Sequence, residues 1–203
     1  ILCIDGGRVA ANPAEVVNCT FAYNIVNTID STAGLCLNNG RLKLRNSILY
    51  SNRRMPKTTY QTDLVTGSDF YVVGYGRADV DYTLFTSLDA TNVSGAASSV
   101  ISLGEHVYTG SPRFVSGADD FAALISSTSE TLQQTIGFTP DDETMAAVLA
   151  LDVHTTGQRY PMVDGGDYET PVGAEPSPNG ARVNLGYYGG TAEAETTPVG
   201  QPE

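Results

Sequence analysis

An internal repeat organises the first half of this sequence and constrains its fold more than any other feature. Residues 2–8 (LCIDGGR) align with residues 35–41 (LCLNNGR) and with residues 71–77 (YVVGYGR). The Gly-Arg pair therefore recurs after 33 and then 36 residues. Repeats of this length, built from short β-prone segments, cannot bury their apolar side chains alone and stack on their neighbours. The repeat predicts a solenoid.

A second element follows each copy of the repeat, at residues 18–24, 46–52 and 81–87. Strands of successive coils lie about 4.8 Å apart, so stacking places equivalent side chains in columns and lets polar side chains bond along them. The aligned elements predict one apolar interior column and one polar column at a turn: Phe21, Leu49 and Leu84, and Asn18, Asn46 and Asp81.

These elements carry a family resemblance. Residues 18–24 and 46–52 resemble rungs of right-handed parallel β-helix proteins, the architecture of pectate-lyase-like enzymes and of many bacterial surface proteins. Residues 110–115 with 120–121, residues 161–167 and residues 175–191 resemble the closing segment of large bacterial β-helix proteins. The resemblance implies an all-β, right-handed parallel β-helix with a C-terminal capping segment, in a secreted or cell-surface protein. It marks a fold and not an activity.

The chain divides into three parts on this interpretation. Residues 1–125 form the coils, residues 126–191 the capping segment, and residues 192–203 an acidic tail or linker. One short helix is expected over residues 139–152, because Thr139 suits an N-cap, Pro140 the first helical position, and the acids 141–143 the positive end of the helix dipole.

The charge distribution limits the partners. The net charge of −12 argues against a nucleic-acid binder, which needs a basic surface. Residues 1–77 contain eight basic and five acidic residues, a net +3, whereas the remainder contains three basic and 18 acidic residues, a net −15. No apolar run reaches the roughly 18 residues of a membrane span. The apolar start at Ile1 predicts that upstream coils or another subunit cover this edge.

Three cysteines, Cys3, Cys19 and Cys36, lie in the first fifth of the chain. Their spacing matches no zinc pattern, and buried small apolar residues are the simplest interpretation. The repeat places Cys3 and Cys36 in one column of adjacent coils. Neighbouring strands satisfy the Cα separation of about 4.4–6.8 Å that a disulfide tolerates, so a bridge is compatible with this alignment but is not required by it.

The strand at residues 41–45 alternates, which directs Arg41, Lys43 and Arg45 to one face and two leucines to the other. Arg8 and Arg77 are expected above and below Arg41. Two interpretations stay open: a basic stripe that binds an anionic glycan, or a solvated face on which cations pair with acids, Asp79 in particular. Tyr75 is among the eleven tyrosines that could stack on a sugar.

Candidates for metal binding and catalysis are fewer. Asp79 and Asp81 flank Val80 and could share a face that holds a structural Ca²⁺, although the ladder position favours a structural role for Asp81. No other cofactor is implied. No nucleophile motif lies near His106 or His154, so no catalytic residue is assigned.

Two functions are compatible with these features. The first is a non-catalytic structural, adhesive or glycan-contacting module of an extracellular protein. The alternative is a polysaccharide lyase or glycoside hydrolase of the β-helix type. A cluster of acids with Arg or Lys on one exposed face, bordered by long loops, would favour the enzyme.

Overall fold

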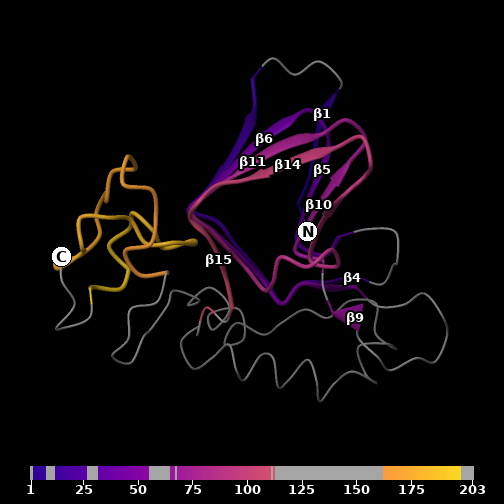
Figure 1. Cartoon of the computed structure of the whole chain (residues 1–203). Helices are drawn as coiled ribbons and strands as arrows, with labels where there is room; N and C mark the ends of the chain where they lie inside the picture. Colours follow the sequence, from indigo (N-terminus) through magenta and orange to yellow (C-terminus); the bar gives the residue numbers. More distant parts are fainter. Residues whose placement is uncertain are drawn as a thin grey trace.

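A computed structural model describes residues 2–7, 12–26, 32–54, 65–66, 68–110, 112 and 162–197. The described residues form an all-β structure of 15 strands and contain no helix (Figure 1). The all-β prediction is thus confirmed for these residues. The helix expected over residues 139–152 lies outside them.

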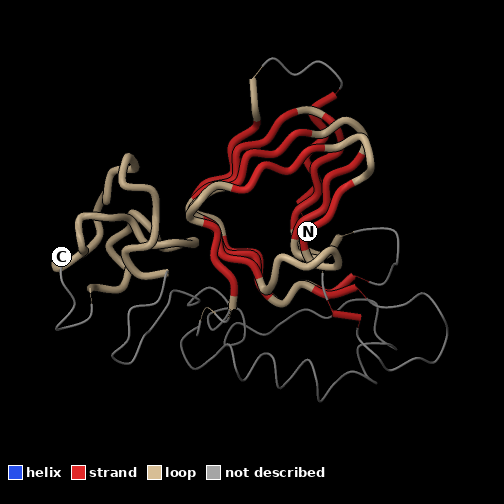
Figure 2. Tube along the Cα trace, in the orientation of Figure 1, coloured by secondary structure: helices blue, strands red, loops and turns tan. Residues whose placement is uncertain are grey.

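Twelve of the strands form three sheets in which all neighbouring strands are parallel. The chain visits the sheets in the same order four times, and we call each such turn a coil (Figure 2). Stacked parallel strands of this kind are typical of a β-solenoid. The sheets consist of β1 (Leu2–Gly7), β5 (Leu35–Asn39), β10 (Phe70–Val73) and β13 (Val93–Gly95); of β2 (Ala14–Val17), β6 (Arg41–Arg45), β11 (Arg77–Val80) and β14 (Val100–Leu103); and of β3 (Thr20–Ala22), β7 (Ser47–Tyr50), β12 (Thr83–Phe85) and β15 (Val107–Thr109).

A fourth, small sheet extends the first two coils. Strand β4 (Ile25–Val26) pairs in parallel with β8 (Arg53–Arg54), and β8 pairs in antiparallel fashion with β9 (Val65–Thr66). Among the described strands, β8 and β9 are the pair that runs antiparallel.

The register of the first sheet confirms the alignment of the first two repeats and corrects the third. Cys3 pairs with Cys36, as the repeat predicts. In the third coil, however, Cys36 pairs with Tyr71, and Leu35 pairs with Phe70 instead of Tyr71. Arg77 still pairs with Arg41. The turn before Arg77 therefore absorbs one extra residue, which the sequence alignment had left inside the strand.

The same offset changes the interior column. Phe21 and Leu49 pair as expected, but their partner in the third coil is Phe85 and not Leu84. Leu84 pairs with Ile48 on the other side of the strand. The prediction that Leu84 belongs to the interior column is wrong by one residue, because the offset of 36 residues between Arg41 and Arg77 continues to Ser47 and Thr83, whereas the sequence alignment used 35.

The predicted polar column is likewise corrected at its third position. Asn18, Asn46 and Tyr82 have positive φ angles of 51°, 50° and 47° at the corner between the second and third sheets. Tyr82, not Asp81, therefore turns the chain at this corner. Asparagine adopts this left-handed conformation more readily than most residues, which explains its use in the first two coils.

A polar ladder does form, but at the corner that follows the third sheet. Asn24 Nδ2 donates to Asn52 Oδ1 at 2.8 Å, and Asn52 Nδ2 donates to Asp69 Oδ1 at 2.8 Å. The second carboxylate oxygen of Asp69 accepts the Thr86 N–H at 3.0 Å. Asn52 and Asp69 are buried, so this ladder satisfies polar groups in the interior of the solenoid.

Residues 162–197 lie beside the solenoid against the outer side of the third sheet (Figure 1). Met162, Val163 and Leu185 pack against Ile48 and Leu84, which explains why both sides of β7 are buried. Backbone groups add to the contact, because Gly186 N–H donates to the Asn46 carbonyl at 2.8 Å. The described part of the expected capping segment thus covers a side of the coils.

The asparagines of the corner hold this segment. Asn18 Nδ2 donates to the Gly189 carbonyl at 3.0 Å, and Asn46 Nδ2 donates to Thr170 Oγ1 at 3.1 Å. Contacts within the segment extend beyond residue 191. Ala194 is buried, and Thr197 N–H donates to the Pro178 carbonyl at 2.8 Å.

Candidate functional site

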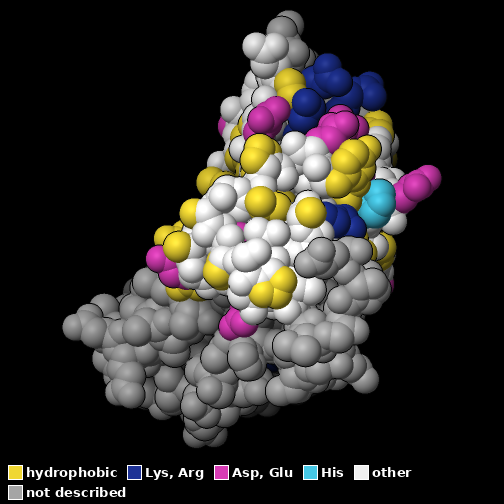
Figure 3. Space-filling view, turned by 90° about the vertical axis from the view of Figure 1, so that its left-hand side faces the viewer, with side chains coloured by type: hydrophobic (Ala, Val, Ile, Leu, Met, Phe, Trp, Pro, Cys, Tyr) yellow, Lys and Arg dark blue, Asp and Glu magenta, His cyan; other side chains and the backbone are white. Residues whose placement is uncertain are grey.

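The outer side of the second sheet, which we call the basic face, carries the predicted cations. In β6 the side chains alternate as expected: Leu42 and Leu44 are fully buried, and Arg41, Lys43 and Arg45 point outward. Lys and Arg side chains gather in one region of the molecular surface, with acidic side chains next to them (Figure 3). The structure therefore brings cations together and places acids among them.

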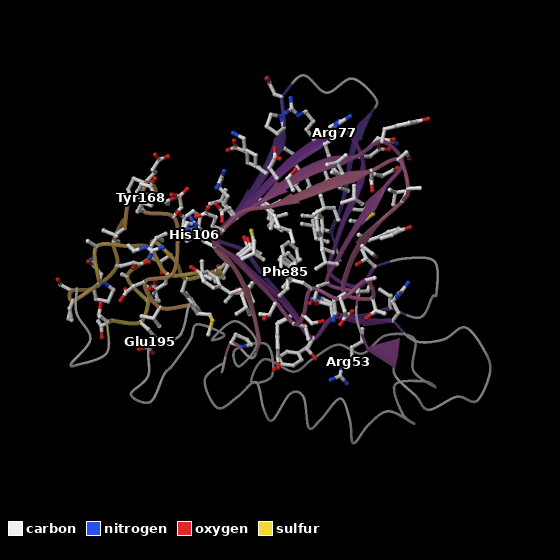
Figure 4. The ribbon with its side chains drawn as sticks, in the orientation of Figure 1. Arg53, Arg77, Phe85, His106, Tyr168 and Glu195 are labelled. Carbon is white, nitrogen blue, oxygen red and sulfur yellow. The ribbon has the colours of Figure 1, made fainter. Side chains whose placement is uncertain are left out.

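Arg41 and Arg77 are the least neutralised part of the basic face. They pair in register across β6 and β11, and both are exposed. Arg77 lies on the outer side of the coils, whereas Phe85 lies inside them (Figure 4). Within the described residues neither guanidinium has an acid within 4.0 Å. Two like charges directly opposite each other on a sheet repel, so an anion that binds both would be favoured.

The other two cations of the face are paired with acids. Lys43 Nζ lies 3.7 Å from Glu15 Oε1. Arg45 Nη1 lies 3.9 Å from Asp81 Oδ2 and 3.9 Å from Asp167 Oδ2. Lys43 and Arg45 therefore form ion pairs with acids. The expected acid, Asp79, is not among these partners, although it lies opposite Lys43 on the adjacent strand.

Arg8, the third cation expected in this column, lies outside the described residues. The strand of the first coil that pairs with β6 is β2, and its first residue, Ala14, pairs with Leu42. In the second sheet, the first coil therefore contributes residues 14–17 opposite residues 42–45, and the alignment of Gly7-Arg8 with Gly40-Arg41 does not give this register.

Tyr75 lies at the same end of the strands as Arg41 and Arg77. It occupies the turn that leads into β11, its side chain is 58% exposed, and its N–H donates to Asn39 Oδ1 at 3.0 Å. An exposed tyrosine ring at this end of the sheet offers an apolar surface for a sugar ring, and the two guanidinium groups offer donors for its anionic substituents.

Asp81 belongs to a separate group at the corner, which we call the acidic corner: Arg45, Asp81, His106 and Asp167. Asp81 Oδ1 accepts the N–H groups of Tyr82 and His106, each at 3.0 Å. His106 Nδ1 lies 3.5 Å from the same oxygen, and the imidazole stacks on the Tyr82 ring at 4.2 Å (Figure 4). Arg45 and two N–H groups thus contact the carboxylate of Asp81, the residue that the sequence pairs with Asp79 as a candidate for calcium binding.

Sequence reasoning missed His106 and Asp167 as members of one group. They lie far from Asp81 in the sequence, and no motif connects them. His106 follows Asp81 by 25 residues, so the repeat periods of 33 and 36 residues do not place it in the next coil, and no periodicity extends to Asp167. Among the described residues no cluster of three or more His, Cys, Asp or Glu is arranged to hold a metal ion.

Within the same residues no helix is long and apolar enough to span a membrane. Comparison with protein-family models, curated proteins and solved structures finds no match to this chain.

Proposed function

We propose that this chain is a non-catalytic, glycan-contacting module of an extracellular protein, and that its basic face binds an anionic polysaccharide. The observation that carries the proposal is the pair Arg41 and Arg77, two exposed cations in register on adjacent strands with no described acid within 4.0 Å. A protein with a net charge of −12 repels polyanions at long range, so binding depends on such a local concentration of positive charge.

We also propose that the solenoid is right-handed and of the pectate-lyase type. The handedness is supported by the general rule that parallel strands joined by crossover connections wind right-handed in about 98% of cases. The proposed partners are the polysaccharide and, at the edge formed by β1, β2 and β3, a further coil or another subunit. At this edge Leu2 and Val17 are each 39% exposed. If light scattering finds only monomers, another subunit is excluded as the partner at this edge.

The test measures binding of the purified chain to a sulfated, a carboxylated and a neutral polysaccharide at several salt concentrations. Replacing Arg77 by Gln should weaken binding to the anionic polymers about 5- to 10-fold, because one charge-assisted contact on an exposed face contributes about 1 kcal/mol. The same substitution should leave the melting temperature unchanged or raise it, since it removes a repulsion with Arg41.

Arg53→Gln is the matched control, because it removes one cation from β8 in the fourth sheet. It should leave binding unchanged. Equal losses for both variants would mean that overall charge and not this pair governs binding, and the assignment of the basic face would then be wrong.

The enzymatic alternative rests on the acidic corner. Two carboxylates, those of Asp81 and Asp167, lie within 3.9 Å of one guanidinium nitrogen of Arg45, and His106 adjoins Asp81. Carboxylates and imidazole are the usual groups for general acid–base catalysis on polysaccharides. Detection of new reducing or unsaturated ends in the same polysaccharide screen, abolished by Asp167→Asn, would favour this function over the first.

A further inference from the structure

The outer side of the first sheet carries two adjacent thiols. Cys3, Cys36, Tyr71 and Ser94 form one row across four parallel strands. Leu35 and Leu37, which flank Cys36, are fully buried, so the row points away from the core. Cys3 is exposed and Cys36 is half-buried, and both are free thiols in this structure.

The placement of these two residues suits a covalent bond. In-register neighbours on parallel strands are separated by about 4.8 Å, within the Cα range of about 4.4–6.8 Å that disulfides span. The side chains also interact. Burial, a hydrogen bond with Cys3 and the charge of the Cys3 thiolate together raise the pKa of Cys36 to about 12.

We propose that Cys3 and Cys36 form a disulfide that ties β1 to β5 and so fastens the first coil to the second. Formation of this bond does not depend on glycan binding. It adds a redox-controlled modification site to the edge of the solenoid, where β1 has a single neighbouring strand in the described residues.

The bond forms by thiol–disulfide exchange with a small-molecule disulfide such as oxidised glutathione. The exposed Cys3 thiolate attacks one glutathione sulfur, which forms a mixed disulfide and releases one glutathione thiolate. The Cys36 thiolate then attacks Cys3 Sγ, closes the protein disulfide and releases the second glutathione thiolate. Two protein thiols are oxidised, one glutathione disulfide is reduced, and the two thiol protons pass to the released thiolates.

The half-buried position of Cys36 sets the order of these steps. Its raised pKa disfavours the thiolate, so Cys36 is the poorer first nucleophile. Once Cys3 is in the mixed disulfide it carries neither a thiol proton nor a negative charge. Of the causes that raise the pKa of Cys36, only burial then remains, and the second attack becomes easier.

Cys19 provides an internal control. It lies in the turn between β2 and β3, and its Sγ donates to the Val17 carbonyl at 3.3 Å. This hydrogen bond and its position after the second sheet separate it from the row of Cys3 and Cys36. We expect Cys19 to keep its thiol when the other two are oxidised.

The experiment equilibrates the full chain with oxidised and reduced glutathione, counts thiols, and maps linked peptides by mass spectrometry without reduction. The three thiols of the chain should fall to one, with Cys3 and Cys36 in one linked pair. Hydrogen exchange of the amides of residues 2–7 should slow by about 100-fold on oxidation, because the bond suppresses local opening of the first coil.

Two variants separate this bond from general thiol oxidation. Cys19→Ser should form the bond and show the same slowing, whereas Cys36→Ser should end as a glutathione adduct on Cys3 with unchanged exchange. A persistent Cys3–glutathione adduct in the unsubstituted chain, a bridge that involves Cys19, or a covalent dimer would each overturn the proposal.

Discussion

Replacing Leu49 by Ala is expected to lower the free energy of unfolding by about 2–5 kcal/mol. Leu49 is fully buried in the third sheet, where it stacks between Phe21 of the first coil and Phe85 of the third. Truncation removes favourable apolar burial and leaves a cavity between two aromatic neighbours, and both terms destabilise the fold. Thermal or urea unfolding followed by circular dichroism measures the change.

Leu88→Ala is the matched control for this substitution. Leu88 is 41% exposed in the turn after the third sheet, so the same truncation should change the stability by less than about 0.5 kcal/mol. An unaltered melting temperature for Leu49→Ala would mean that this side chain faces solvent, and the register of β7 would have to be revised.

Replacing Asp69 by Ala should cost about 3 kcal/mol, because this carboxylate terminates the buried ladder. Asp69 Oδ1 accepts the side-chain and backbone N–H groups of Asn52 at 2.8 and 3.2 Å, and Oδ2 accepts the Thr86 N–H. Removing the carboxylate leaves buried donors without partners, which costs about 1–3 kcal/mol for a group of this kind. Asp79→Ala, the same change at an exposed position of β11, should have little effect.

The contribution of Asp69 to the free energy of unfolding depends on pH, and the direction of this dependence follows from its pKa. Burial raises the pKa of this carboxyl above its ordinary value of 3.8, although the hydrogen bonds from Asn52 and Thr86 oppose the rise. The folded chain therefore holds a proton on Asp69 more tightly than the unfolded chain does. This contribution to stability is complete below the ordinary pKa and is lost as pH rises through the folded pKa.

Comparison with Asp69→Asn isolates that contribution, because Asn retains an oxygen for Asn52 but cannot titrate. The stability of the unsubstituted chain relative to Asp69→Asn should fall as pH rises from acidic toward neutral values. A relative stability that rises over this interval would show that the hydrogen bonds outweigh burial and that the carboxylate is the favoured form.

Local repetition explains what the sequence could predict. The recurrence of Leu-Cys followed by Gly-Arg is sufficient to place Cys3 beside Cys36 and Arg41 beside Arg77, because stacked coils align equivalent residues. The alternation in residues 41–45 likewise predicts which side chains face out, since a strand has a period of two. Parallel strands and the composition of the basic face both follow from these two patterns.

Registers and long-range contacts depended on the tertiary structure. The third coil has one more residue between Phe70 and Arg77 than the second has between Leu35 and Arg41, and only packing decides that the turn absorbs it. Phe85 takes the place expected for Leu84 because the offset set by this turn continues into β12, and Leu84 then contacts the C-terminal segment.

The acidic corner is a site that the sequence alone does not predict. Arg45 lies between Asp81 and Asp167 because residues 162–197 pack against the third sheet, a contact that no repeat or motif encodes. Stacking in a solenoid determines neighbours one period apart, so the sequence predicts the coils. Docking of a non-repeating segment depends on the shape and polarity of a whole surface, and only the folded chain determines which side chains meet there.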